Sequence, residues 1–477
     1  MRRRLSTAGF VFGMLLLLPG MVVFAGEDQA ASPQQSAEIP RGVQKLSEIK
    51  VLDFETAQQI AIADNPSIAA AEARVLQAKA RVQEARSAYW PRLDLDASVA
   101  RTDLPFSLIN QPVSPGIGSI PVDDPRTAYL ASLVASWKLF DGFARKFSNA
   151  AARYAEQGSR EALNDARRLL LSAVGLSFYT ALLARANVSI ALADEAFNKR
   201  QVEDSQARFN AGSGTLSDIL NFKVQINATR NIRFREEKAY QSALYGLAAL
   251  MGIAKARFPE GLELARLEDE TPEEMITPEA GGLIAYAYRN RPDILKNEFV
   301  FKEAESVEKV ARAEYFPSLG VFGSLDGQRY DDAWFESDDF GNSIGVQLTY
   351  NLFAGGATRA RVWEAKSRQL EVDKDLDNLR NQVASDIRRA VAELKTAQDQ
   401  LRLQRSNRAL VQQNRDLTEK EYKAGQVSLV RLNEAQRDLS TALARLALAL
   451  VSMRLAWHNL EVETGRVLAD QGITGKP

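Results

Sequence analysis

The 477-residue chain contains no cysteine and a single histidine, His458. The absence of cysteine excludes disulfides, thiolate chemistry, cysteine-ligated zinc and an N-terminal lipidated cysteine. One histidine gives no basis for a histidine-rich metal site or a catalytic triad. The sequence also lacks a phosphate-binding glycine loop and a nucleophile motif. Nothing in it therefore predicts an enzyme, a metal site or a bound cofactor.

The chain also lacks an excess of either charge. Its 60 basic and 61 acidic residues leave a net charge of −1, so no basic surface for nucleic acid is expected. Beyond the N-terminus, no run approaches the ~18 apolar residues of a membrane-spanning helix, so no further transmembrane helix is expected. The N-terminus itself has arginines at positions 2–4, an apolar run (Phe10–Leu18), a Pro-Gly step and a small-residue pattern ending at Ala25.

That order is typical of an export signal. We expect residues 1–25 to be a signal peptide, with an uncleaved membrane anchor as the alternative. Residues 26–47, rich in Ala, Ser, Gln and Pro, are expected to form a flexible lead-in to the folded chain.

The sequence is duplicated. Tyr89-Trp90-Pro91 returns 226 positions later as Tyr315-Phe316-Pro317, and Leu139-Phe140-Asp141-Gly142 returns 213 positions later as Leu352-Phe353-Ala354-Gly355. A step this long is far from the 20–50 residues of a solenoid repeat. We expect one structural unit over 48–250 and its copy over 283–465. A linker or equatorial segment (251–282) joins them, and a C-terminal tail (466–477) follows.

Each repeat contains two segments in which apolar and polar residues alternate, predicting strands at about 91–104, 127–141, 317–329 and 341–354. Their length and single apolar face suit transmembrane β-strands, although a soluble sheet covered by its own helices has the same pattern. Aromatic residues gather where the strands approach the helices and resemble a membrane-interface girdle: Tyr89, Trp90, Trp137, Tyr315, Phe316 and Tyr350.

Very long helices follow the strands. Residues 142–209 and 355–422 contain no proline, and each stretch would extend about 100 Å as a helix. Each ends at an Ala-Gly step, Ala211-Gly212 or Ala424-Gly425, after which a return helix is expected. A shorter helix begins at Pro66 and another at Pro292. Stacked end to end with a return helix, each would match one long helix in height.

Four strands per chain cannot close a barrel, and open strand edges are not tolerated in lipid. Several chains must therefore share one barrel. Two chains would give eight strands, whose interior fills with side chains, whereas three would give twelve strands and leave a lumen.

The double repeat, the Asn-Pro and Arg-Pro helix starts, Leu-Phe-Asp-Gly and the Ala-Gly turns resemble the TolC family of outer-membrane channels. This resemblance implies an α+β membrane protein in the Gram-negative outer membrane. It implies a homotrimer with a 12-stranded β-barrel on a long α-helical periplasmic barrel. It also implies a periplasmic adaptor (membrane fusion protein) and an inner-membrane pump of the resistance-nodulation-division (RND) or ABC type. The implied function is a tripartite export channel that opens at its periplasmic helical tip.

The resemblance also implies where the gate lies. Asp218 occupies the family's acidic position after the first turn, and Tyr422 its tyrosine before the second. Arg431 stands where an Asp is usual, Glu434 keeps the next acidic position, and Val427 replaces an expected arginine. We therefore expect a mixed-charge ring, or ordinary solvated charges. The turns, Ala211, Gly212, Ala424 and Gly425, are the expected adaptor-docking tips.

Two further interpretations stay open. A soluble periplasmic coiled-coil scaffold or adaptor would share the long helices but would need no paired strands with aromatic ends. Five acidic residues between positions 331 and 339 could bind divalent cations, although a solvated loop is the simpler expectation. The exported substrate is not encoded in any of these patterns.

Overall fold

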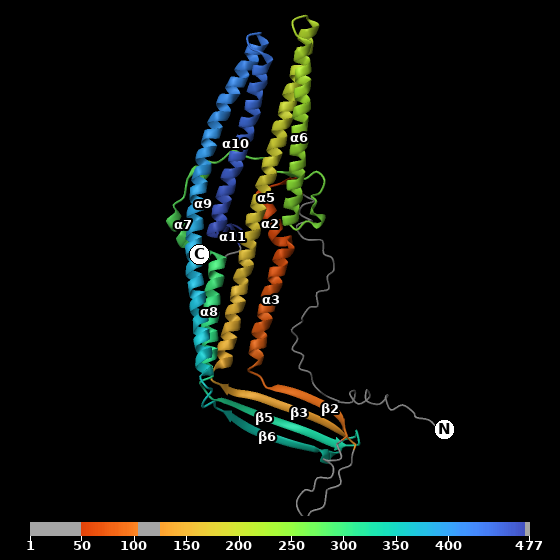
Figure 1. Cartoon of the computed structure of the whole chain (residues 1–477), viewed down its shortest axis with the longest axis vertical. Helices are drawn as coiled ribbons and strands as arrows, with labels where there is room; N and C mark the ends of the chain where they lie inside the picture. Colours follow the sequence, from red (N-terminus) through yellow and green to blue (C-terminus); the bar gives the residue numbers. More distant parts are fainter. Residues whose placement is uncertain (1–48, 104–124, 473–477) are drawn as a thin grey trace, which may run out of the picture.

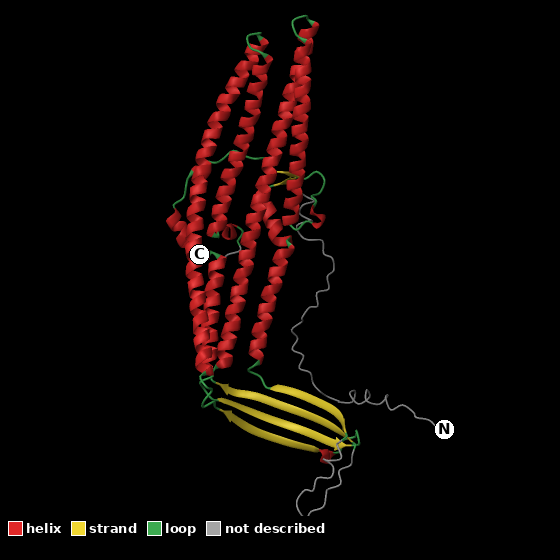
Figure 2. Ribbon diagram, viewed as in Figure 1, coloured by secondary structure: helices red, strands yellow, loops and turns green. Residues whose placement is uncertain are grey.

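The computed structural model describes residues 49–103 and 125–472. The expected signal peptide and lead-in lie outside the described residues, as do residues 104–124 between the first two strands. The described chain is an elongated body with one sheet at one end and helical hairpins that reach to the other end (Figure 1). Helices dominate the body and the sheet is a single layer (Figure 2).

The sheet has four antiparallel strands in the order β2-β3-β5-β6. These are β2 (Arg92–Thr102), β3 (Arg126–Asp141), β5 (Ser318–Tyr330) and β6 (Phe340–Thr349). Because side chains alternate between the two faces of a strand, the register places the predicted apolar positions on one face as far as the bulge between Lys138 and Phe140 of β3. Leu133, for example, pairs with Leu95 on one side and Leu325 on the other. The sheet was therefore correctly predicted, apart from the end of β6.

The prediction that the fourth strand runs to residue 354 was wrong, because β6 ends at Thr349. Thr349 pairs with Ser318, the first residue of β5. Pro317, which precedes it, has no backbone N–H to donate to a ladder. The alternating pattern continues to Leu352, but there is no partner strand beside it.

Two helices of 67 residues form the long rods of the body: α5 (Ala144–Asn210) and α9 (Ala357–Lys423). The return helices are α6 (Leu216–Leu250) and α10 (Leu429–Thr464), and the shorter ones are α3 (Pro66–Ser87) and α8 (Pro292–Ala313). Two small helices, α2 (Phe54–Asp64) and α7 (Ala280–Asn290), precede α3 and α8. Helix packing places the rods side by side in the order α6/α3, α5, α10/α8, α9.

In the first repeat, Asn65 links α3 to α6 where the two helices meet end to end. Its side chain caps α3 by accepting a hydrogen bond from Ser67 N at 2.8 Å, and its Nδ2 donates to Leu250 O, the last residue of α6, at 2.6 Å. One asparagine thus satisfies a free N–H of α3 and a free carbonyl of α6. Gly252 makes the turn with φ 73°, and a Cβ there would lie 2.4 Å from Asp64 O.

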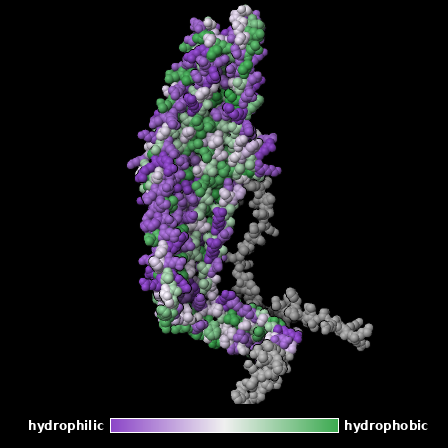
Figure 3. Space-filling view, in the orientation of Figure 1, coloured by the Kyte–Doolittle hydropathy of each residue, from purple (hydrophilic) through white to green (hydrophobic). Residues whose placement is uncertain are grey.

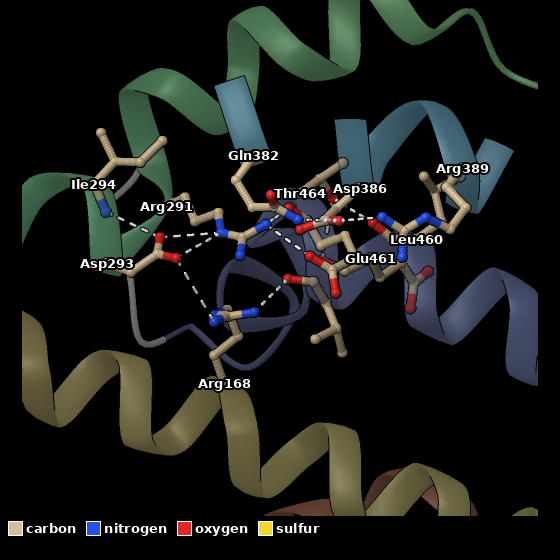
Figure 4. A network of polar contacts seen from close by, with 12 residues as sticks. Arg168, Arg291, Asp293, Ile294, Gln382, Asp386, Arg389, Leu460, Glu461 and Thr464 are labelled. Carbon is tan, nitrogen blue, oxygen red and sulfur yellow. Dashed lines mark hydrogen bonds and ion pairs between the residues drawn. The ribbon is translucent and has the colours of Figure 1, made fainter. Parts of the chain in front are cut away.

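The second repeat makes the same junction with Arg291. Its Nη1 donates to Glu463 O and to the Glu463 carboxylate, each at 2.7 Å, while its Nε pairs with Asp293 at 3.0 Å. Arg168 of α5 approaches Asp293 at 3.9 Å and donates to Val462 O (Figure 4). Because Arg168 and Arg291 are both buried, the carboxylates also offset the cost of burying two positive charges.

The segment between α6 and α7, residues 251–279, crosses the rods at mid-height and is called the belt below. Its strand β4 (Glu263–Leu264) pairs in parallel with β1 (Val51–Leu52). Farther on, the Trp457 indole donates to Glu274 O at 2.7 Å and Gln398 contacts Thr277 at 2.7 Å. The belt therefore ties the first repeat to α9 and α10 of the second. The expected boundary at 282 was slightly late, since α7 begins at Ala280.

Residues 466–470 are not a loose tail. They form α11 (Arg466–Asp470), whose Val467 and Leu468 pack with Leu171 and Val462. His458, the single histidine, is buried, and its Nε2 lies 3.0 Å from Leu171 O.

Helices α5 and α10 each hold an 18-residue window apolar enough to cross a membrane by length and composition. The expectation that no further stretch approaches this length was therefore wrong. Half of the α5 window is buried, and this part of the chain packs in the core around Val174 and Phe178. In the space-filling view, hydrophilic side chains cover the α9 side of the body (Figure 3). Packing between rods buries half of the apolar window of α5 and 39% of that of α10.

Candidate functional site

The two helical turns at the end remote from the sheet have the same geometry. Gly212 has φ 74° and donates its N–H to Phe209 O, and Gly425 has φ 75° and donates to Tyr422 O, each at 3.0 Å. A Cβ built on either glycine meets no atom within 4 Å. Glycine is therefore required by the left-handed backbone rather than by close packing. Ala211 and Ala424 lie beside them and are exposed.

Tyr422 lies in an apolar cluster that joins the two hairpins, called the tip cluster below. Its buried ring packs edge-on against Phe222 of α6 with centroids 6.5 Å apart, and the Arg208 guanidinium lies 4.9 Å from its centroid. Burial raises the pKa of the Tyr422 hydroxyl, and the nearby negative charge of Asp218 raises that pKa further. The members of the tip cluster are Phe197, Phe222, Tyr422, Leu429 and Leu432.

The four expected gate residues form two groups. Asp218 is half-buried near Tyr422, whereas Arg431 and Glu434 are exposed and approach each other at 3.6 Å on α10. Asp218 and Arg431 occupy equivalent positions, since each backbone N–H donates to the capping hydroxyl three residues earlier (Thr215 or Ser428). A negative charge is favourable in the first turn of a helix and a positive charge is unfavourable. Arg431 therefore opposes the start of α10, and Glu434 partly compensates.

Several tip residues were not predicted from the sequence. Phe222 follows Ile219 by three residues, so the two share one face of α6, and both are buried. Gln436 of α10 donates to Asp194 of α5 at 2.8 Å and gives a polar link between the hairpins. Helical spacing could have indicated Phe222, but no local pattern pairs residues 194 and 436.

At the opposite end of the body, the six predicted aromatic residues all lie at the helix-proximal end of the sheet. Tyr89 and Trp90 precede β2, Tyr315 and Phe316 precede β5, Trp137 is near the end of β3, and Tyr350 follows β6. All six are exposed in the single chain. The Trp137 indole donates to Tyr89 O at 3.0 Å, which joins β3 to the segment that enters β2.

The faces of the sheet differ in polarity. One presents exposed apolar side chains from all four strands: Leu93, Leu95, Val99, Leu133, Trp137, Leu325, Ile344, Val346 and Leu348. On the other face Asp326 accepts hydrogen bonds from Ser132 and Ser324, and Ser324 contacts Ser343 at 2.9 Å. A sheet with one apolar face and one face that carries polar side chains suits the wall of a transmembrane barrel, which contacts lipid outside and water inside.

The acidic loop between β5 and β6 is organised by Arg329. Its guanidinium pairs with Asp339 at 2.9 Å, Glu336 at 3.0 Å and Asp332 at 3.3 Å. In the described parts of the chain, no group of three or more His, Asp or Glu residues is arranged to hold a metal ion. One guanidinium thus contacts three of the loop's five carboxylates and offsets one of their negative charges.

Comparisons with known proteins agree with this geometry. The family model described as "Outer membrane efflux protein" matches residues 57–253 and 283–466, which are the two repeats. The chain belongs to the outer membrane efflux protein family. Protein CyaE of Bordetella pertussis is 26% identical over 378 residues, covering 78% of this chain and 74% of that protein. Outer membrane efflux protein BepC of Brucella suis is 25% identical over 390 residues, covering 81% and 79%.

Solved structures show the same fold. The outer membrane channel CmeC of Campylobacter jejuni superposes with a TM-score of 0.72 at 17% identity, covering 86% of this chain and 85% of that one. CusC superposes with a TM-score of 0.70 at 18% identity, covering 88% and 94%. The protein is thus an outer membrane channel with a periplasmic helical extension. The comparisons favour this function over the soluble scaffold that the sequence left open.

Proposed function

We propose that three copies of this chain form the exit duct of a tripartite export system. The duct receives substrates from an inner-membrane pump, of the RND or ABC type, through a periplasmic adaptor. The unpaired edges of the sheet carry this proposal. β2 and β6 each have one neighbour within the described residues, and both carry exposed apolar side chains. In lipid these edges must pair, and a second and third copy supply the partners.

We further propose that the tips close the duct. The tip cluster holds the α5/α6 hairpin against the α9/α10 hairpin within each chain, and opening would separate them. Around a threefold axis, Asp218, Arg431 and Glu434 would form a ring of mixed charge. Adaptor binding at the exposed turns, Gly212 and Gly425, would supply the free energy of opening. The six aromatics near the sheet would sit at the membrane–water interface.

Two measurements test the proposal. The mass of the mature protein in detergent should correspond to three chains, and it should form conducting channels in planar bilayers. Substituting Asp218→Asn together with Glu434→Gln should raise the conductance of the closed state. A monomer that stays soluble without detergent would contradict the duct, whereas a conducting trimer with unchanged conductance in the variant would contradict only the charged ring.

A further inference from the structure

A groove with three cations and three aromatics lies at the membrane-proximal ends of α8 and α9. Its volume is about 940 Å³. It is lined by Arg312, Tyr315 and Phe316 at the end of α8, and by Arg359, Trp363 and Lys366 on the first turns of α9. None of its lining residues is acidic. The groove therefore concentrates positive charge next to large exposed aromatic rings.

Two of the three cations have no carboxylate partner. Arg312 pairs with Glu308 at 2.5 Å, but neither Arg359 nor Lys366 forms an ion pair or side-chain hydrogen bond with the described residues. They are seven residues apart on α9 with Trp363 between them, so all three side chains share one side of the helix. Trp363 is 74% exposed. An unpaired cation on each side of an open indole is an arrangement that suits an amphipathic anion, whose charge the cations attract and whose apolar part the indole contacts.

The groove lies on the belt side of the helical wall. On α9, Gln398 and Arg405 contact the belt through Glu274 and Asp269. Residues on the same face of α9 as Gln398 can be found by counting back along the helix. In a supercoiled helix, which repeats every seven residues, five repeats lead to Trp363; in a straight helix of 3.6 residues per turn, ten turns lead to Val362. Arg359 and Lys366 flank both positions. The groove thus faces the same way as the belt, whichever way α9 twists.

The opposite side of the wall carries a different set of residues. Ser452 and Asn459 of α10, together with Thr396 of α9, line a depression there that the belt does not cover. A duct must keep its inner wall clear, so the belt side is the outer side. This step rests on the proposed function. It places the cationic groove outside the duct, beside Tyr315 and Phe316 of the aromatic girdle.

We propose that this groove binds the headgroup of an anionic phospholipid of the outer membrane. Arg359 and Lys366 contact the phosphodiester, and Trp363 lies at the level of the glycerol backbone and upper acyl chains. Charge complementarity supports a phosphate ligand, since the groove contains cations and no acid. Continuity with the aromatic girdle supports a lipid, because tryptophan and tyrosine gather at the headgroup level. Lysine and arginine near such a surface attract anionic lipids individually.

Native mass spectrometry of the full mature protein in detergent tests this inference. The unmodified protein should retain phosphatidylglycerol in preference to phosphatidylcholine. The variant Arg359→Gln/Lys366→Gln should lose that preference by roughly five- to thirtyfold, since each cation near an anionic lipid surface contributes about fivefold. The matched control is Arg388→Gln/Lys395→Gln, two exposed cations with the same spacing farther along α9. It should retain the preference.

Four outcomes would overturn the inference. Equal retention of the two lipids, or equal losses in both variants, would show that the groove has no specific role. Displacement of phosphatidylglycerol by millimolar inorganic phosphate would show a site for the free anion. A Trp363→Cys variant provides a unique thiol, because the chain has no cysteine. If this thiol does not react with a polar maleimide in the lipid-free oligomer, a neighbouring chain, and not a lipid, fills the groove. Conductance is measured on the same variants. Variants that still form conducting channels but show no lipid preference would contradict the lipid site alone, whereas a protein that forms no channel would contradict the proposed duct.

Discussion

Truncating Tyr422 should open the channel, and the size of the effect follows from its burial. The ring is 8% exposed and packs between Phe222 and the Arg208 guanidinium. Removing a buried aromatic ring costs about 3–5 kcal/mol where the cavity cannot collapse. If the tip cluster separates on opening, Tyr422→Ala removes this free energy from the closed state alone. About 3 kcal/mol corresponds to roughly a hundredfold shift toward the open state for each chain.

The conservative variant separates the ring from its hydroxyl. Tyr422→Phe retains the packing and loses only polar contacts near Ser205 and Asp218, so its shift should be about 1 kcal/mol, or roughly fivefold. Phe222→Ala, on the other hairpin, should behave like Tyr422→Ala, because the same contact is lost.

Single-channel conductance in planar bilayers is the assay, and Phe178→Ala is the control. Phe178 is a buried aromatic of α5 in the core beside the belt, remote from the tips. It should lower the melting temperature without increasing conductance. The reasoning is refuted if Tyr422→Ala and Phe178→Ala are equally destabilising and both leave the closed-state conductance unchanged. The tip cluster would then move as one rigid unit during opening.

Three other substitutions test local features, each by thermal melting of the solubilised protein. Arg431→Asp should stabilise the start of α10 by about 0.3–1 kcal/mol, and a lower melting temperature would contradict the helix-dipole argument. In Gly175→Ala the new Cβ would lie 2.2 Å from the His458 ring, which should cost about 1–3 kcal/mol. Adding His458→Ala should recover part of this loss, and no recovery would place the strain elsewhere. Hydrogen bonds from Arg230 and Lys199 lower the pKa of buried Glu195 to about 2, so this carboxylate stabilises the fold above its unfolded pKa. Glu195→Gln should therefore be less stable at neutral pH, with a difference that narrows as pH falls from about 4.5 toward 2, and a constant difference would exclude this linkage.

The rods could be predicted closely from the sequence because their limits are set by local chemistry. Proline interrupts a helix, and residues 142–209 and 355–422 contain none; an Ala-Gly step ends a helix, and one follows each segment. The sequence therefore predicts one uninterrupted helix over each segment. The structure places α5 and α9 within two residues of both limits. The strands could also be predicted, from the alternation of apolar and polar residues, except at the end of β6, where pairing with β5 stops at Thr349.

The belt could not be predicted in the same way. Its fold depends on contacts with distant residues: β4 pairs with β1, and Glu274 accepts hydrogen bonds from α9 and α10. Nothing in the periodicity of 251–279 specifies those partners. The same limit applies at the tips, where Asp218 and Tyr422 were identified only through a family resemblance. Their proximity depends on two hairpins that are separated by about two hundred residues of sequence.

The arrangement of the free edges explains how a single contact between neighbouring chains can close both the β-sheet and the helical wall of the duct. In the sheet, the free edges are β2 and β6; in the helical wall, they are α3/α6 and α9. β2 continues directly from α3, and β6 leads directly into α9. A rotation that pairs β6 of one chain with β2 of the next therefore also brings α9 of the first chain beside α3 of the next. Such a head-to-tail contact is heterologous, and it forms a closed ring only when the rotation completes a circle. Because the sheet and the wall share this rotation, a substitution that weakens the seam between neighbouring strands should also separate the rods.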